Sequence, residues 1–261
     1  MSNPRLPPEL LDHIFDLLHD TRSALKNCCL VSRSWIPHTR RYLFANITFG
    51  TMKNLRSWKT AFPDPSTSPA RYTRCLLVKF PQVIRTADAE RGWITTFSQV
   101  VHFEVMISGS GVSRPDFSLV PLHGFSPALK SLRGTFANFP PPSISKLIRS
   151  FPHLRDLTVT THWFYRNGGF YEPPVAIRPS SPFMFTGSLE LSMEGGMKPI
   201  ASHLLSPSIG LNFRELRLVW NWEEDVSVTI ALVERYSPTL EALKITCELQ
   251  GATVDHLHSH C

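Results

Sequence analysis

The sequence lacks any apolar stretch that approaches the ~20 residues needed to cross a lipid bilayer. It also lacks the pattern of a signal peptide, because its first residues show neither a charged-then-apolar order nor a small-residue cleavage site. The cysteines, Cys28, Cys29, Cys75, Cys247 and Cys261, are odd in number and have no C-x-x-C spacing. These absences predict a protein of the cytoplasm or nucleus, with reduced thiols and no association with membranes.

The common signatures of catalysis are missing as well. The sequence contains no G-x-S-x-G motif and no phosphate-binding loop. A G-x-G begins at residues 109–111, but Arg114 occupies the position where a nucleotide-binding loop needs a third glycine. Acidic residues 223–225 precede a predicted helix, where the helix dipole alone accounts for them. We therefore predict that the chain is not an enzyme and binds no cofactor.

Groups that could bind a metal gather at the C-terminus. Residues 255–261 contain three alternating histidines, an aspartate and a cysteine. No second group of ligands partners this run elsewhere in the sequence, and chain ends are usually frayed. We expect adventitious metal binding at most, and no structural metal site.

The charge is positive but scattered. The net charge is +6, and the tightest basic cluster is Arg33, Arg40 and Arg41, which is too small to follow a nucleic-acid backbone. The composition is otherwise that of a globular chain, with 42 % hydrophobic residues. Its 22 prolines against 13 glycines favour many short elements joined by turns. We predict that nucleic acid is not a partner.

The first fifty residues predict three short helices with an unusually wide apolar face. In the first helix, residues 10, 14 and 17 form one apolar row, and residues 11, 15 and 18 form a second row beside it. A module of ~45 residues cannot cover such a face by itself. Either the rest of the chain or a partner protein must cover it.

The run "LPPELLDHIFDLLHDTRSALKNCCLVSRSWIPHTRRYLF" resembles the F-box. The matching positions are Leu6, Pro7, Glu9, Leu10, Leu11, Ile14, Leu18, Leu30, Val31, Ser32, Arg33 and Trp35. The sequence departs from the family pattern at residues 20–25, where Asp-Leu-x-x-Leu is frequent. The resemblance implies docking onto the Skp adaptor of a cullin–RING ubiquitin ligase, with the rest of the chain capturing a protein substrate. The residues expected to contact the adaptor are Leu6, Pro7, Leu10, Ile14, Leu18, Val31 and Trp35.

Beyond a predicted linker at residues 50–70, the pattern φ-x-x-φ-x-φ recurs, where φ is an apolar residue. Its copies begin at positions 73, 100, 129, 154, 186, 213 and 240, and their spacing is close to that of leucine-rich repeats. Helical patterns lie between copies, at residues 144–151, 199–205 and 226–233. The predicted fold is therefore α/β, with a three-helix F-box at residues 1–49 and an irregular leucine-rich-repeat-like solenoid of alternating strands and helices at 71–261.

The repeat is degenerate. Leucine-rich repeats usually place Asn or Cys eight residues after the first apolar position, and only Asn221 fits. Residues 163–185 form an insertion rich in aromatic residues and proline. An irregular α/β domain in which the leucines recur by chance is the alternative to the solenoid.

Alternation along each strand predicts which residues form the binding surface. The residues between the two core positions are Leu77, Glu104, Arg133, Thr158, Glu190, Arg217 and Lys244. Those just before them are Cys75, His102, Ser131, Asp156, Ser188, Glu215 and Ala242. We predict that the substrate contacts Glu104, Arg133, Asp156, Glu190, Glu215, Arg217 and Lys244. The favoured function is a substrate receptor of a ubiquitin ligase. The alternative is a non-catalytic interaction scaffold whose F-box-like helices only cap the repeats.

Overall fold

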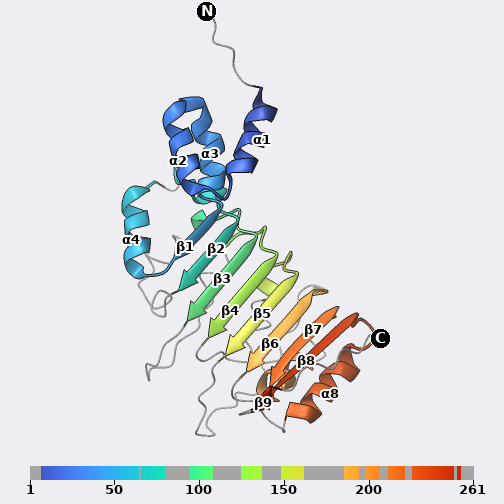
Figure 1. The fold of residues 1–261 in the computed structure, drawn as a ribbon. Coiled ribbons are helices and arrows are strands. Elements are labelled where there is room, and N and C mark those ends of the chain that lie inside the picture. Colours follow the sequence, from blue (N-terminus) through green and yellow to red (C-terminus); the bar gives the residue numbers. More distant parts are fainter. Residues whose placement is uncertain are drawn as a thin grey trace, which may run out of the picture.

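Helices at the N-terminus are followed by a long sheet in the computed structural model of the chain (Figure 1). The residues that the structure describes are 7–64, 66–79, 95–107, 125–136, 148–161, 185–193, 198–205, 211–220, 225–249 and 252–253. The helical elements are α1 (Pro8–Leu18), α2 (Arg22–Val31), η1 (Arg33–Trp35), α3 (Ile36–Leu43), α4 (Met52–Ala61), η2 (Pro69–Tyr72), α7 (Lys198–Leu204) and α8 (Asp225–Tyr236). The strands are β1 (Asn46–Phe49), β2 (Cys75–Lys79), β3 (His102–Ile107), β4 (Ser131–Phe136), β5 (Asp156–Thr161), β6 (Ser188–Met193), β7 (Glu215–Trp220), β8 (Ala242–Leu249) and β9 (Ala252–Thr253).

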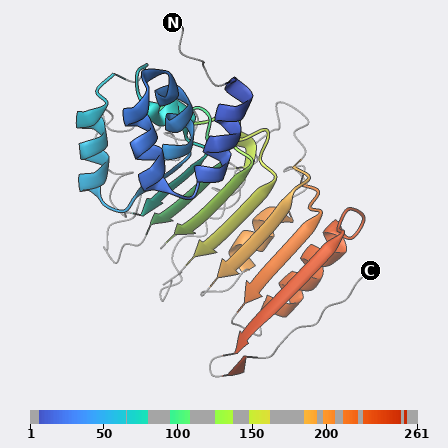
Figure 2. The ribbon, with the colours of Figure 1, turned by 45° about the horizontal axis from the view of Figure 1, so that its top comes forward.

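The strands lie side by side in the order of the sequence (Figure 2). Each neighbouring pair from β1 to β8 is parallel, and the short β9 pairs antiparallel with the end of β8. A parallel sheet in sequence order needs a crossover between every pair of strands, which the long intervals between the strands supply. The mixed α/β fold and the N-terminal helices are therefore confirmed. The assignment of the sheet to the leucine-rich-repeat class stays a prediction.

A single backbone contact recurs at the start of each strand. The carbonyl oxygen just before one strand accepts hydrogen bonds from N–H groups at the start of the next. The Ala45 oxygen accepts from Arg74 and Cys75 at 2.8 and 2.9 Å, and the Arg214 oxygen accepts from Glu241 at 2.7 Å. The same strand-entry contact is made by the carbonyl oxygens of Arg74, Val101, Lys130, Arg155 and Gly187. It fixes each strand in the same register on its neighbour.

Two rows of apolar side chains from the strands form one side of the main core. They are the rows of Leu76 and Val78 in β2, and both continue in register to β8. In the strands between the two ends of the sheet these residues are almost fully buried. The buried members of the rows are Leu76, Phe103, Leu132, Leu157, Leu189 and Leu216, and Val78, Val105, Val159, Leu191 and Leu218.

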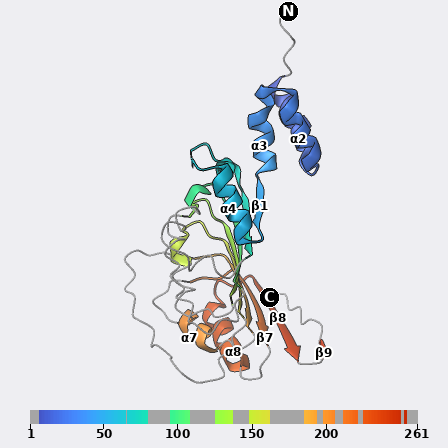
Figure 3. The ribbon, with the colours of Figure 1, turned by 90° about the vertical axis from the view of Figure 1, so that its left-hand side faces the viewer.

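The described helices cover one face of the sheet. Figure 3 shows α4, α7 and α8 on the same side, and no described helix lies over the opposite face of β2–β8. A series of buried rings fills the space between sheet and helices: Phe97, Phe125, Phe151, Phe185, Phe213 and Tyr236. The face opposite the helices is called the open face below.

The segment expected as a linker contains ordered structure. Within residues 50–70, α4 buries Leu55 completely, and η2 buries Ala70. The Thr51 side chain caps α4 by accepting a hydrogen bond from the Asn54 N–H. The preceding strand β1 also joins the sheet, so the sheet begins directly after α3.

The helix predicted around residues 226–233 is present as α8. Val226 and Ile230 are 46 % and 53 % exposed, whereas Thr229, Leu232 and Tyr236 are buried. The side of the helix that holds Leu232 and Tyr236 therefore packs on the core. The helix expected at 199–205 is present as α7 with Ile200 and Leu204 buried, while most of the one expected at 144–151 lies outside the described residues.

We expect His203 in α7 to make the stability of the fold depend on pH. This side chain is buried, and its Nε2 atom has no hydrogen-bond partner in the described part of the chain. Burial, and then the positive charge of Arg149, lower the pKa of His203 below 6.5. The unfolded chain therefore binds a proton more readily, so this contribution to stability is full above the unfolded pKa and is lost as the pH falls below it.

We expect the melting temperature to fall between about pH 7 and about pH 5, and to fall less in His203→Leu. Calorimetry across this pH range measures how steeply the melting temperature changes with pH. His153→Leu is the control for replacing a histidine by leucine, because His153 is exposed. If the melting temperature of His203→Leu changes with pH as steeply as that of the wild type, His203 is not the cause of the pH dependence.

Candidate functional site

The N-terminal helices have a small core of their own, centred on Phe15. This ring is fully buried, and it contacts Trp35 edge-on at a centroid distance of 5.8 Å. The His38 ring stacks on it at 6.0 Å, and the Tyr42 ring lies at 6.3 Å. Leu11 and Leu25 complete the buried cluster, which is separate from the core beneath the sheet.

Two polar contacts fix α3 against α1 beside this core. The His38 Nδ1 atom lies 2.9 Å from an Asp12 carboxylate oxygen, and the Tyr42 hydroxyl donates to Asp16 at 2.6 Å. Each pair is one helical turn from the other, so the two contacts form successive rungs. The hydrogen bond to Asp16 raises the pKa of Tyr42 to about 12, so this donor keeps its proton at neutral pH.

The two apolar rows of α1 differ in exposure. Leu11, Phe15 and Leu18 face the small core, while Leu10 and Leu17 are 51 % and 73 % exposed. Two further apolar side chains are exposed at the end of α2: Leu30 at 86 % and Val31 at 68 %. These four residues, Leu10, Leu17, Leu30 and Val31, are called the apolar face below.

The residues expected to contact an adaptor differ in their accessibility. Pro7, Leu10 and Val31 are exposed, and Leu6 lies outside the described residues. Ile14, Leu18 and Trp35 are partly buried, the last two because they pack against Phe15 and its neighbours. The expected set omitted Leu17 and Leu30. Leu17 belongs to the 10/14/17 row, which was visible in the sequence, whereas the exposure of Leu30 depends on how α2 packs.

Residues 4–49 match the family model described as F-box-like. This match covers the three helices, the apolar face and strand β1, so the chain contains an F-box-like domain. The expectation of an F-box protein is supported to that extent. No curated protein matches the chain.

On the open face, the structure brings the predicted binding residues into one register. Leu77, Glu104, Arg133, Thr158, Glu190, Arg217 and Lys244 are consecutive partners across β2–β8. This row is called the charged ladder. Asp156 and Glu215 belong to the adjacent row, which contains Cys75, His102, Ser131, Ser188 and Ala242. The predicted register is thus the observed one, and the binding role of the residues stays a prediction.

The cations of the ladder differ in how strongly they are already engaged. The Arg217 guanidinium contacts Glu215 at 2.7 Å and Glu190 at 3.9 Å, and the hydrogen bond to Glu215 raises the pKa of Arg217. Arg133 and Lys244 are exposed and have no ion pair within the described residues. A ligand carboxylate would therefore displace no partner from the described part of the chain at these two positions.

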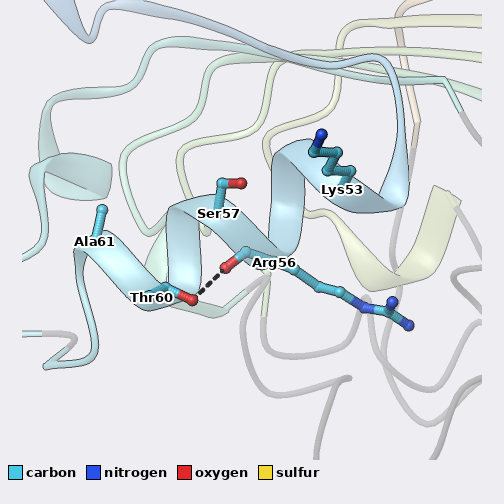
Figure 4. A pocket seen from close by; sticks show the side chains of 5 residues that line it. All are labelled: Lys53, Arg56, Ser57, Thr60 and Ala61. Carbon is cyan, nitrogen blue, oxygen red and sulfur yellow. Dashed lines mark hydrogen bonds between the residues drawn. The ribbon is translucent and has the colours of Figure 1, made fainter.

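A surface depression of about 460 Å³ lies along α4, away from both surfaces described above. Lys53, Arg56, Ser57, Thr60 and Ala61 line it, and all are exposed (Figure 4). The Thr60 hydroxyl is bonded to the Arg56 carbonyl oxygen at 3.0 Å, so it is already satisfied within the helix. The depression has no arrangement of groups that suggests chemistry.

Among the described residues, no group of three or more His, Cys, Asp or Glu side chains could hold a metal. The histidine run at 255–261 lies outside them, so the expectation about this run stays untested. None of the helices that the structure describes has the length and apolar character required to cross a bilayer.

We expect Phe15→Ala to unfold α1–α3 locally while the sheet remains folded. Removing a buried phenylalanine costs about 3–5 kcal/mol, and this core is too small to absorb that loss. Hydrogen exchange should show lost protection in α1–α3 and unchanged protection in β4–β7. Leu17→Ala is the matched control, since an exposed side chain contributes less than about 0.5 kcal/mol. Equal loss of protection in the sheet would show that the two cores are one unit.

Proposed function

We propose that the protein is the substrate-recognition subunit of an SCF-type cullin–RING ubiquitin ligase. Its F-box-like domain binds the Skp adaptor, and the open face of the sheet captures a protein substrate. The observation that carries the proposal is the apolar face, which lies within the matched residues and is exposed to solvent. The chain itself performs no reaction, because the enzymes recruited through the adaptor transfer ubiquitin.

The apolar face has the character of a docking surface. Surface leucines that occur singly are ordinary, but four large apolar side chains on a module of about 40 residues are not. Burying each of them against a partner contributes roughly 1.5–3 kcal/mol. The fixed packing of α1 on α3 lowers the cost of binding further, because the helices are already held in place by the Asp12 and Asp16 contacts.

The alternative is a scaffold in which these helices only cap the repeats. In that case the apolar face should pack on the sheet. Leu10 and Leu17 are instead exposed, and the partly buried Trp35 packs on Phe15 within the helical core. The end of the sheet next to these helices is covered by α4, with Leu55 and Trp58 in the core. These observations favour docking over capping.

The charged ladder favours a protein substrate over nucleic acid. Its acidic members, Glu104 and Glu190, lie directly beside its basic members. A phosphate backbone requires one sign of charge, whereas a protein surface can match both. The residues proposed to contact the substrate are Glu104, Arg133, Asp156, Glu190, Glu215, Arg217 and Lys244.

The double variant Leu10→Asp, Leu17→Asp should abolish co-purification of the Skp adaptor with the full-length chain. Two carboxylates would have to be buried in an apolar interface, and this cost exceeds the contribution of the lost leucines. Val226→Asp, Ile230→Asp is the matched control, because those residues are equally apolar and exposed but lie on α8. A folded Leu10/Leu17 variant that still binds the adaptor would exclude this face as the docking site.

Arg133→Glu should reduce substrate capture several-fold and leave adaptor binding intact. Arg217→Glu should act partly through the fold, because it places three carboxylates together at Glu190 and Glu215. Quantitative mass spectrometry of affinity-purified complexes measures adaptor and substrates in one experiment. Arg56→Glu on α4 is the control for a charge reversal away from the open face. If Arg133→Glu and the wild type capture the same substrates in the same amounts, the charged ladder is not part of the substrate site.

A further inference from the structure

Positive charge is concentrated in one part of the chain. Residues 33–79, from the start of η1 to the end of β2, contain nine Lys and Arg but a single Asp, which gives them a net charge of +8. The rest of the chain has 18 Lys and Arg against 20 Asp and Glu, a net charge of −2. The positive charge of the protein therefore arises from this one segment.

The fold brings six of these cations together where the sheet adjoins the N-terminal helices. Figures 1 and 3 place α4 beside β1 at this end of the sheet. The Phe44 ring contacts the Trp58 ring of α4 at a centroid distance of 5.8 Å. Arg40 and Arg41 lie one turn before Phe44, on the same side of α3. Helix α3 also contacts η2, which carries Arg71. The cations of these elements are called the basic surface: Arg40, Arg41, Lys53, Arg56, Lys59 and Arg71.

The cations of the basic surface have no ion pair with the described part of the chain. Five of them are exposed, and Lys59 is partly exposed. Arg71 donates to the neutral Tyr72 hydroxyl at 2.8 Å and lies over the ring of the same residue. Asp64 is the single acid of the segment, and it accepts hydrogen bonds from the N–H and hydroxyl of Ser66. The surface therefore attracts anions within a Debye length, about 8 Å at physiological salt.

The cations are arranged for a partner that carries several negative charges. Lys53 and Arg56 line the depression on α4 together with Ser57, and none of its lining residues is acidic. Figure 4 shows the Lys53 and Arg56 side chains extending from the helix in different directions, so they would contact separate anionic groups. Arg40 and Arg41 add two further positions on α3, and a guanidinium binds a carboxylate through paired hydrogen bonds. A flexible chain with several carboxylates fits this arrangement better than a single small anion.

We propose that the basic surface binds an acidic segment of a partner protein. Aspartates and glutamates spaced along such a segment contact the arginines of α3 and the cations of α4 at the same time. Complementary charge of this kind accelerates association and selects among partners. None of the six residues belongs to the apolar face or to the charged ladder, so the inference is independent of the proposed function.

Two features favour an acidic protein over other polyanions. Single-stranded nucleic acids gain affinity by stacking their bases on exposed aromatic rings. Beside the basic surface, the rings of Phe44, Trp58 and Phe62 are partly buried and pack on one another. A helix that lies on a membrane needs an apolar row that inserts among the lipids. The residues of α4 that line the depression have charged or hydroxyl side chains, apart from Ala61.

Fluorescence anisotropy of a labelled polyglutamate peptide with the full-length chain tests the proposal. We expect saturable binding that weakens as salt is added. Arg40→Glu with Lys53→Glu should raise the dissociation constant at least about tenfold, because attraction becomes repulsion on both helices. Arg133→Glu with Lys244→Glu is the matched control, since these exposed cations of the open face give the same change in net charge. The control should change the dissociation constant less than about twofold. No binding of the peptide, or equal weakening by the two double variants, would overturn the proposal.

Alanine variants separate loss of binding from loss of folding. Arg40→Ala with Lys53→Ala removes both cations without adding repulsion, and alanine is well accommodated in helices. We expect this variant to keep the melting temperature of the wild type and to bind the peptide at least about threefold less tightly. If it binds the peptide as tightly as the wild type, the basic surface is not the binding site.

Two further probes distinguish the other classes of partner. One is a polythymidine oligonucleotide with the same net charge as the peptide, and the other is a vesicle of phosphatidylcholine and phosphatidylserine. We expect the oligonucleotide to bind less tightly than the peptide, and we expect no sedimentation of the full-length chain with the vesicles at physiological salt. Tighter binding of the oligonucleotide, or sedimentation that Arg40→Glu with Lys53→Glu abolishes, would show that the partner is not an acidic protein.

Discussion

The strand-entry contact is the interaction on which the rest of the structure depends. In each repeat, the carbonyl oxygen just before one strand accepts hydrogen bonds from N–H groups at the start of the next strand. These contacts run from Ala45 at one end of the sheet to Arg214 at the other. This contact sets the register, and the register places like positions in rows. The apolar rows fill the core, and the intervening rows face away from the helices. Both the core and the open face therefore result from one repeated backbone geometry.

The series of strand-entry contacts begins at β1 and ends at β8, and the sheet is packed differently at these two ends. Ala45 directly follows the N-terminal helices, so the first strand is formed by residues that the F-box-like match includes. The aromatic side chains of Phe44, Trp58 and Phe62 contact one another there and cover the end of the core. At the other end, no described strand follows β8 in the same register. The asymmetry is a matter of packing at the two edges, while the strands between them are equivalent.

The sequence was most informative where the pattern was local and repeated. The φ-x-x-φ-x-φ spacing predicted every strand from β2 to β8 and the register of the charged ladder, because the alternation of side chains follows directly from strand geometry. It also predicted two apolar rows on α1. It did not predict α4, because residues 50–70 were expected to form a linker and the helix has few apolar residues. The spacing also predicted α8, but it does not show which apolar residues are buried, because the exposed Val226 and Ile230 have helical spacing as well.

The site was less accessible to prediction than the fold, for a physical reason. Which residues carry charge on the open face follows from alternation, but whether a charge is free depends on side-chain contacts between strands. Arg133 and Arg217 occupy equivalent positions in the same row, yet among the described residues only Arg217 has carboxylates within 4 Å. No periodicity distinguishes them.

The connection between the two cores has a further consequence for the proposed function. The helical core ends at Leu43, the sheet core begins at Phe44, and β1 begins two residues later. No flexible linker separates the apolar face from the sheet, since α3 also contacts η2 beside the first strands. A ligase receptor must hold its substrate at a fixed place relative to the adaptor, because the transferred ubiquitin has to reach a lysine. In this chain the sheet itself supplies that rigidity, with its first strand as the attachment of the F-box-like domain.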